Sequence, residues 1–235
     1  MRGVIAFLMT ALSIACARPS AASECLENRP AVTVRIRDYA HVKAKSLAKA
    51  TEIAGRIYKR AGVGIEWLTV VSQDVGSMHD APRADGTPLP IAQLTIDIVT
   101  PSIAKRRGYA DDVLGFVSVP PEGGMGRIGN VVYERIKDVA AGGTSSTSEI
   151  LGVIIAHDIG RLILGTGSGT LNGVMTRSWG RQDLERVNPL ALAFTPAETE
   201  RLRATLRRDS APSFPVGTGG TEPGECLASR DDVGR

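Results

Sequence analysis

The chain has 235 residues, a formal net charge of +3, 43% hydrophobic residues and 23% charged residues. This length is sufficient for one large domain or two small ones with a true core, and the composition excludes wholesale disorder. The charge is too small to indicate nucleic acid, because binding surfaces for nucleic acid show a concentrated basic stripe. We therefore expect no nucleic-acid partner.

The first 22 residues are expected to be a secretion signal. Arg2 gives a positive start, and residues 4–17 form an uncharged, mostly apolar run of 14 residues. That run is shorter than the ~20 residues of a membrane-spanning helix but fits a signal peptide, and residues 20–22 (SAA) provide a cleavage site. The alternative is lipoprotein processing at Cys16. Either reading predicts an exported, periplasmic or extracellular protein, with no transmembrane segment left after plain cleavage.

Two cysteines remain after cleavage, Cys25 and Cys226, one near each end of the chain. In an oxidising compartment an even pair of cysteines indicates a disulfide. Closing so long a loop stabilises a fold by roughly 5 kcal/mol on the chain-entropy model. Two unpaired surface thiols are the alternative, because the sequence does not show whether the two ends meet.

The mature chain is predicted to begin with two strands around a helix. Residues 31–38 (AVTVRIRD) alternate apolar and polar side chains, as a half-buried strand does. Residues 43–61 carry apolar side chains at helical spacing, and the glycines that follow end this helix. Residues 65–71 (IEWLTVV) predict the second strand.

The middle of the chain predicts further strands, loops and one helix, from apolar periodicity and from clusters of turn-forming residues. In chain order we expect a loop at 72–90, strands at 94–99 and 115–119, a turn at 120–126, a helix at 127–141 and a flexible linker at 142–148.

The most apolar helix is predicted at 149–164. Ser146 and Glu149 have the spacing of a capping box, and Gly165 provides a left-handed stop. A last helix to about residue 208 begins at residues 195–198 (TPAE), with another capping signature. Strands early and helices late predict one α+β domain over 23–210, followed by a flexible tail at 211–235.

The residues that could carry chemistry lie within 151–179. The predicted helix places His157 and Arg161 at positions i and i+4, on one helical face, with Asp158 next to His157. Zinc peptidases use this spacing for two histidines, with a glutamate after the first as general base. This stretch therefore has the layout of a zinc-peptidase helix, but Asp158 stands at the position of the glutamate and Arg161 at that of the second histidine.

The chain resembles a family of exported zincin-like metallopeptidases with the pattern A-H-E-I-G-H-L-L-L-G, a further His, and then G-I-M. The resemblance covers most of 30–208 in layout and is detailed over 113–179. It implies a zincin-like α+β fold with a small, twisted, mixed sheet and packed helices, and a zinc cofactor. It also places Met175 at the Met-turn beneath the site, for which packing in the core is the alternative explanation. The matching residues are 114–116 (LGF), 129–133 (GNVVY), 156–157 (AH), 159–160 (IG), 162–165 (LILG), 173–175 (GVM) and Trp179.

The ligand positions depart from the pattern of that family. The alignment puts His157 at the first ligand, Asp158 at the general base, Arg161 at the second ligand and Gly169 at the third. Catalytic zinc needs three protein ligands, and a guanidinium has no lone pair to give. Its charge ~4 Å from a divalent ion costs roughly 8 kcal/mol at an effective dielectric of 20. We expect no cofactor, with zinc only if the site is retained.

Other residues offer alternatives at this site. Asp158 could bind a metal itself or pair with Arg161 at i+3, and the pairing is favoured. His157 is expected to be a buried imidazole that hydrogen-bonds a neighbour. His41, between a strand and a helix, and His79, in a proline-rich loop, are the other histidines, and neither is expected to join it.

Three further features have plain structural interpretations. The glycine-rich loop at 165–173 lacks the lysine of a phosphate-binding loop and follows a helix, so we expect a hinge. Ser168 and Ser178 do not lie in a G-x-S-x-G nucleophile elbow. Residues 201–208 (RLRATLRR) predict the solvated face of an amphipathic helix, with contact to an anionic surface as the alternative.

Three functions follow as hypotheses. The favoured one is a catalytically inactive relative of the metallopeptidases that keeps a peptide-binding or protein-binding role, for which strand addition is one mode. The second is a zinc-dependent peptidase with a non-standard site built around His157 and Asp158. The third is a structural or interaction protein of the cell envelope, in which the helix at 149–164 is only core. The oligomeric state does not follow from the sequence.

Overall fold

The computed structural model describes residues 29–71, 93–165, 168–170, 172–177 and 179–210. Several sequence predictions fall outside the described residues: the signal at 1–22, Cys16, Cys25, the loop at 72–90, His79, Ser178, the tail at 211–235 and Cys226.

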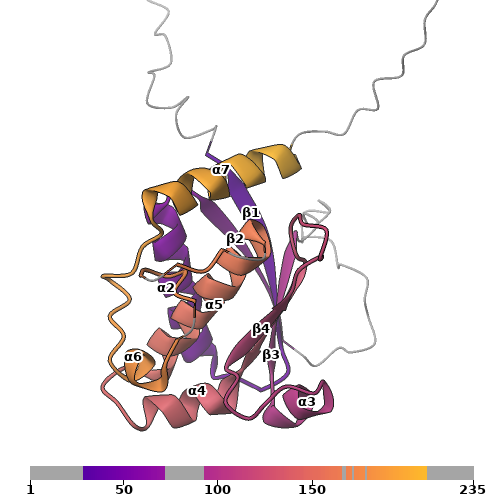
Figure 1. The fold of residues 1–235 in the computed structure, drawn as a ribbon. Coiled ribbons are helices and arrows are strands. Elements are labelled where there is room, and N and C mark those ends of the chain that lie inside the picture. The colour runs from indigo at the N-terminus through magenta and orange to yellow at the C-terminus, as the bar shows by residue number, and fades with distance from the viewer. Residues whose placement is uncertain (1–28, 72–92, 166–167, 171, 178, 211–235) are drawn as a thin grey trace, which may run out of the picture.

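A five-stranded sheet forms the centre of the fold (Figure 1). Its strands lie in the order β2-β1-β3-β5-β4, with neighbours parallel except for β4, which pairs antiparallel with β5 and forms one edge. The sheet is thus mixed, as expected. The strands are β1 (Ala31–Asp38), β2 (Gly64–Val71), β3 (Leu94–Val99), β4 (Gly115–Ser118) and β5 (Ile128–Val132).

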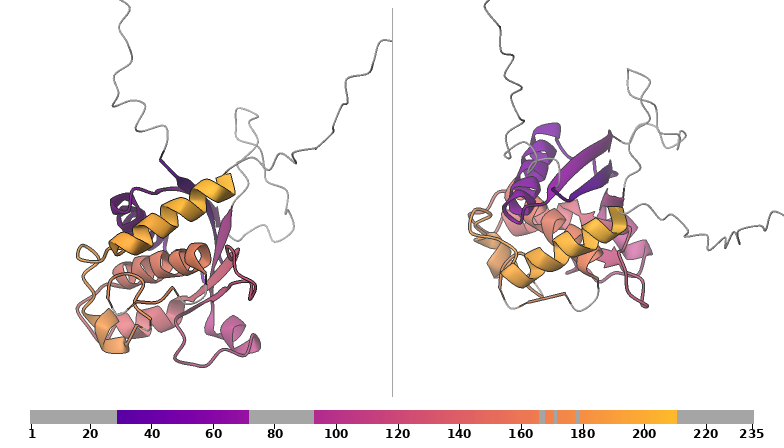
Figure 2. Two further views of the ribbon diagram at one scale, coloured as in Figure 1. Left: turned by 45° about the horizontal axis from the view of Figure 1, so that its top comes forward. Right: turned by 90° about the horizontal axis from the view of Figure 1, so that it is seen from above.

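The helices divide unevenly between the two faces of the sheet. The long helices α2 (Ala44–Arg60) and α5 (Thr147–Leu164) pack against each other and against the same face. Helix α7 (Pro196–Ser210) lies next to α5 across one end of the molecule (Figure 2). The remaining helices are short: α3 (Pro101–Arg106), α4 (Tyr133–Ala140) and α6 (Arg181–Glu185).

The alternating pattern of β1 decides which face is the core. Val32, Val34 and Ile36 are at most 1% exposed and belong to the main apolar cluster with α2 and α5. Arg35 and Arg37 lie on the other face and are half-buried. A smaller cluster with its centre at Val99, Ala104, Phe116 and Val132 lies beside α3 on that second face. The core is therefore one-sided, and the second face of the sheet stays largely polar.

Helix α5 is the centre of the core. Fourteen of its eighteen residues are buried, and the Tyr58 hydroxyl of α2 donates a hydrogen bond to the Ala156 carbonyl oxygen at 3.0 Å. A Cβ atom on Gly152 would lie 2.7 Å from the Ala50 carbonyl oxygen, so glycine allows the two helices to approach closely. None of the helices in the described part of the chain has the length and apolarity needed to cross a bilayer.

Two predicted elements need correction. Residues 128–132 form strand β5, and only 133–140 are helical, so the predicted helix at 127–141 is wrong in its first part. Val131 and Val132 fit the periodicity of a helix as well as that of a strand. Their segment forms a strand because it pairs with β3 and β4. The linker at 142–148 is not free either, because the Thr144 and Ser145 amides donate to the Glu185 carbonyl oxygen at 2.8 and 3.0 Å.

Candidate functional site

A capping box fixes where α5 begins and so where its polar residues fall. The Ser146 Oγ accepts from the Glu149 amide at 3.3 Å, and the Glu149 carboxylate accepts from the Ser146 amide at 2.8 Å. The Ser146 amide and hydroxyl both donate to the Glu149 carboxylate, and these two hydrogen bonds lower the pKa of Glu149. The predicted cap is confirmed, and it places His157 in the middle of a helix whose surroundings are core.

The His157 ring is held by a backbone carbonyl of the following loop. Its Nδ1 lies 2.9 Å from the Val174 carbonyl oxygen, and the side chain is 8% exposed. A carbonyl oxygen only accepts, so Nδ1 carries the proton and Nε2 keeps a lone pair. Burial lowers the pKa of His157, which keeps the ring neutral at pH 7. The expected buried, hydrogen-bonded imidazole is confirmed, with a backbone partner.

Met175 lies directly against the same helix. It is fully buried, and its sulfur lies 2.5 Å from the position that a Cβ atom would take on Gly160. The turn before it needs glycine, because Gly173 has a φ of +83° and a Cβ atom there would lie 2.6 Å from the Ala193 carbonyl oxygen. The loop therefore packs Met175 within one helical turn of His157, at the position that the resemblance assigns to the Met-turn.

Asp158 points from α5 toward strand β4. It is 2% exposed, its Oδ2 has no hydrogen-bond partner, and this oxygen lies 2.6 Å from where a Cβ atom of Gly115 would be. Burial raises the pKa of Asp158 to about 8, although the charge of Arg161 acts in the opposite direction. The carboxyl is mostly protonated at pH 7, so it is a poor general base there.

The predicted ion pair between Asp158 and Arg161 is wrong. Arg161 is exposed, and no nitrogen of its guanidinium lies within 4.0 Å of the Asp158 carboxylate. The spacing i+3 permits contact, but Asp158 turns inward to β4 whereas Arg161 extends into solvent. Its charge still acts over a distance, since it lowers the pKa of His157 and opposes the rise at Asp158.

The residues at the predicted ligand positions do not fit a zinc ion. An imidazole, a guanidinium and a glycine leave a single good donor at these positions, and the neighbouring Asp158 carboxyl is largely protonated. At the third position, a Cβ atom on Gly169 would lie 2.6 Å from the Arg177 Cγ. His41 is exposed in the β1–α2 turn, with a φ of +54°. In the described part of the chain, no three His, Cys, Asp or Glu side chains gather as a metal-binding group.

Ser168 and the basic face of α7 have structural roles. The Ser168 hydroxyl is 4% exposed and donates to the Gly165 carbonyl oxygen at 2.8 Å, so it supports a turn. Arg201 donates to the Leu164 carbonyl oxygen at 3.3 Å, and Arg203 donates to the Ala61 carbonyl oxygen at 2.8 Å. The basic face of α7, predicted to be solvated, thus uses two of its arginines at the C-terminal ends of α5 and α2.

Strand β4 has an outer edge with no backbone partner among the described residues, and this edge, which lies beside Asp158, was not predicted from the sequence. The Val132 amide donates to the Leu114 carbonyl oxygen at 2.8 Å, and Phe116 pairs with Asn130. In antiparallel pairs every second residue bonds across the ladder, so the backbone groups of Gly115 and Val117 point away from β5. Strand β4 therefore presents two N–H and two C=O groups along its outer edge. Only the strand order could have revealed this edge.

Comparisons with known proteins give weak similarities. No protein-family model and no curated protein sequence matches the chain. Among solved structures, it is similar to archaemetzincin from Methanopyrus kandleri, with 15% identity, a TM-score of 0.47, and 77% of this chain and 98% of that chain covered. It is also similar to metalloproteinase-II from Bacteroides fragilis, with 12% identity, a TM-score of 0.45, and coverage of 76% and 54%. These scores are too low to transfer residue roles to this chain.

Proposed function

We propose that this chain is an exported, metallopeptidase-like protein that does not hydrolyse peptides through zinc and instead binds an extended peptide or protein segment. The observation that carries the proposal is the donor set on α5. His157 has the tautomer of a metal ligand, but Asp158 is buried and mostly protonated, and Arg161 brings a positive charge. A helix with the layout of a zinc-peptidase helix thus carries one side chain that repels the ion, Arg161, and one that is mostly uncharged, Asp158.

The edge of β4 supports the binding part of the proposal. An added strand would pair with the outward backbone groups of Gly115 and Val117, which gives affinity that depends little on side chains. Ser118 is exposed and Val117 is half-buried, so a bound segment would lie partly over the surface next to α5. An unpaired edge is otherwise an aggregation risk that proteins cover or blunt.

A zinc peptidase with a non-standard site around His157 is the second candidate function. It is favoured by the hydrogen bond from Nδ1 to the Val174 carbonyl, because metal-binding histidines fix their free nitrogen in this way. The third candidate, a structural or interaction protein of the cell envelope, is supported by the deep burial of α5.

Metal content separates the first candidate from the second. The chain from residue 23 onward, purified without chelator or affinity metal and equilibrated with micromolar zinc, is expected to retain no stoichiometric zinc. Chelators should then leave its melting temperature unchanged. About one zinc per chain, lost in His157→Ala, would contradict the proposal.

Peptide binding is tested at the strand edge itself. The variant Val117→Pro removes an N–H group that points away from β5, so the ladder with β5 remains intact. Peptides enriched from a random library on the native chain should lose binding to this variant while its melting temperature stays close to that of the native chain. Equal binding to both proteins would show that the peptide does not bind at the edge of β4.

A further inference from the structure

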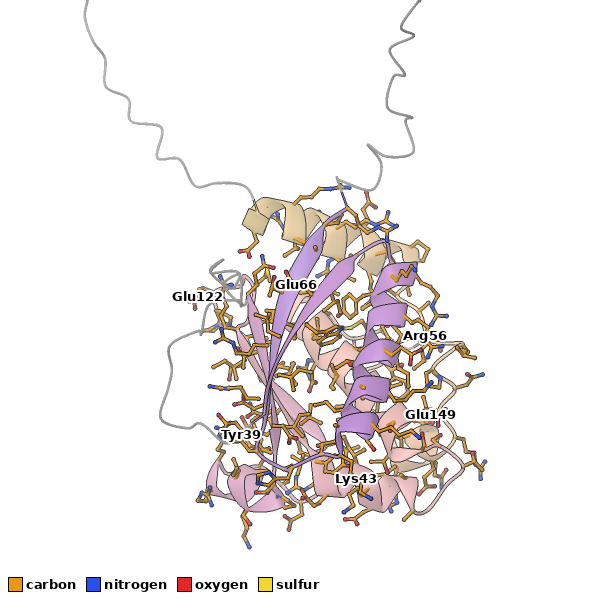
Figure 3. The ribbon with its side chains drawn as sticks, turned by 180° about the vertical axis from the view of Figure 1, so that it is seen from behind. Tyr39, Lys43, Arg56, Glu66, Glu122 and Glu149 are labelled. Atoms are coloured by element: carbon orange, nitrogen blue, oxygen red, sulfur yellow. The ribbon has the colours of Figure 1, made fainter. Side chains whose placement is uncertain are left out.

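The second face of the sheet carries a basic cavity that the proposed function does not use. Its volume is about 390 Å³, and it lies where β1 and β3 end beside α3. Arg37 and Asp97 line it, and they alternate with Ile36 and Ile98, whose side chains pack on the opposite face, in the main core. In the view from behind, Tyr39 marks this end of the sheet, next to α3 (Figure 3). The cavity is therefore separated from His157 by the sheet.

Among the described residues, three arginines and one carboxylate line the cavity. The Arg37 Nε and Nη2 donate to the two oxygens of Asp97 at 2.7 and 2.8 Å, so this single acid is already used in a bidentate pair. The pair raises the pKa of Arg37. Arg106 and Arg107 have no carboxylate partner among the described residues. Two positive charges of the cavity thus remain uncompensated there.

Two of the three guanidinium groups are held in place by buried partners. Asp97, which is 2% exposed, orients Arg37, and the Arg37 guanidinium carbon also lies 5.8 Å from the centre of the Tyr39 ring. Arg107 Nη1 donates to the side-chain oxygen of Asn130, which is itself 2% exposed. A guanidinium held in one orientation loses less entropy when its remaining N–H groups bind an anion.

The walls of the cavity suit a small carbon skeleton. Val99 and Ile103 give an apolar side, and the Tyr39 ring gives an aromatic one. A volume of 390 Å³ falls in the range of small-molecule sites. Planar, forked guanidinium groups match carboxylate and phosphate oxygens in a bidentate manner.

From this geometry we propose that the cavity binds a small organic dianion, either a phosphate monoester or a dicarboxylate, through Arg106 and Arg107. The two charges of such a ligand match the two arginines without a carboxylate partner, and its carbon atoms contact Val99 and Ile103. This site is independent of zinc chemistry and of peptide binding at β4.

The test is calorimetric titration of the full mature chain with glycerol phosphate and, separately, with succinate, at constant ionic strength. Binding of either probe supports the site, and the stronger probe identifies the anion class. Arg106→Gln and Arg107→Gln should each weaken binding roughly tenfold, as expected for charge-assisted hydrogen bonds. Amide chemical shifts should move at 37–39, 97–99 and 103–107.

Lys105→Gln is the matched control. Lys105 lies on the same helix and its substitution changes the charge equally, but Lys105 does not line the cavity. The affinity of the Lys105→Gln variant for the more tightly bound probe should equal that of the native chain. The proposal is overturned if neither probe binds, or if Lys105→Gln weakens binding as much as Arg106→Gln, because the attraction would then be diffuse charge on α3.

Discussion

At the scale of single residues, Asp158 is the side chain whose chemistry depends most on its surroundings. Its carboxyl loses its proton near pH 4 in the unfolded chain, but only at about pH 8 in the folded one. Between these values the native state holds a proton that the unfolded state has released. The free energy of unfolding therefore falls as the pH rises through this window.

The substitution Asp158→Asn removes this dependence. Relative to the native chain, the variant should gain up to about 1.4 kcal/mol of stability for each pH unit between pH 4 and pH 8. Urea unfolding at several pH values measures the difference, and Asp112→Asn, at an exposed acid, is the control that should show no such trend. A constant difference between Asp158→Asn and the native chain would mean that Asp158 ionises normally in the fold.

Part of the site could be predicted from residues alone. The apolar periodicity around His157 predicts burial, and a buried imidazole needs a hydrogen-bond partner. The direction of Asp158 could not be predicted, because its neighbour is the backbone of Gly115, more than forty positions earlier in the chain. Local spacing pointed to Arg161, and tertiary packing placed the two charges apart.

At the scale of elements, the contact between α2 and α5 depends on one missing side chain. A Cβ atom on Gly152 would lie 2.7 Å from the Ala50 carbonyl oxygen and 2.8 Å from the Ile53 Cβ. Gly152→Ala should therefore push the helices apart and cost about 1–3 kcal/mol, as overpacking does. Thermal unfolding measures this loss.

Gly55→Ala is the control for that substitution. Gly55 also lies within a helix, but its nearest neighbour would be 3.7 Å away, at the Trp67 Nε1. This variant should gain roughly 0.5–1 kcal/mol, because alanine loses less conformational entropy than glycine on folding. Equal effects of the two variants would show that helix propensity, not packing, determines how Gly152→Ala changes stability.

The secondary structure was predicted correctly where the sequence fits the periodicity of a strand and not that of a helix. Residues 31–38 and 94–99 are strands with the predicted bounds, since alternation and β-branched residues agree there. The prediction for 127–141 failed because residues 128–132 pair with two other strands, β3 and β4, which the local pattern cannot reveal. The register and the free edge of β4 are likewise properties of the assembled sheet.

At the scale of the whole molecule, the two ends of the described chain lie near each other, because both bind Gln93. The Gln93 amide donates to the Thr33 carbonyl oxygen at 3.0 Å, and the Gln93 side chain donates to Asp209 at 3.2 Å. The start of β1 and the end of α7 lie on the same side of the fold (Figure 1). This proximity is the condition that the sequence alone left open for a disulfide between Cys25 and Cys226.

We therefore expect this disulfide in the mature protein. From Thr33 and Asp209 the two cysteines are eight and seventeen residues away, which extended chain spans easily. Mass spectrometry of a non-reduced digest should find the linked peptides, and Cys25→Ser should lower the free energy of unfolding by roughly 5 kcal/mol on the chain-entropy model. Free thiols in the oxidised, purified protein would refute the pairing.

The hydrogen bond from Tyr58 to Ala156 has a consequence during synthesis. Its partners are 98 residues apart, and they join the two long helices at the centre of the main apolar cluster. At about 5–20 residues per second, a ribosome needs roughly 5–20 s between these two positions. For that time the unit of β1, α2 and β2 carries an apolar helix face with no partner. A nascent chain stalled before residue 147 should therefore bind holding chaperones, whereas a chain stalled after α5 has emerged should bind them less.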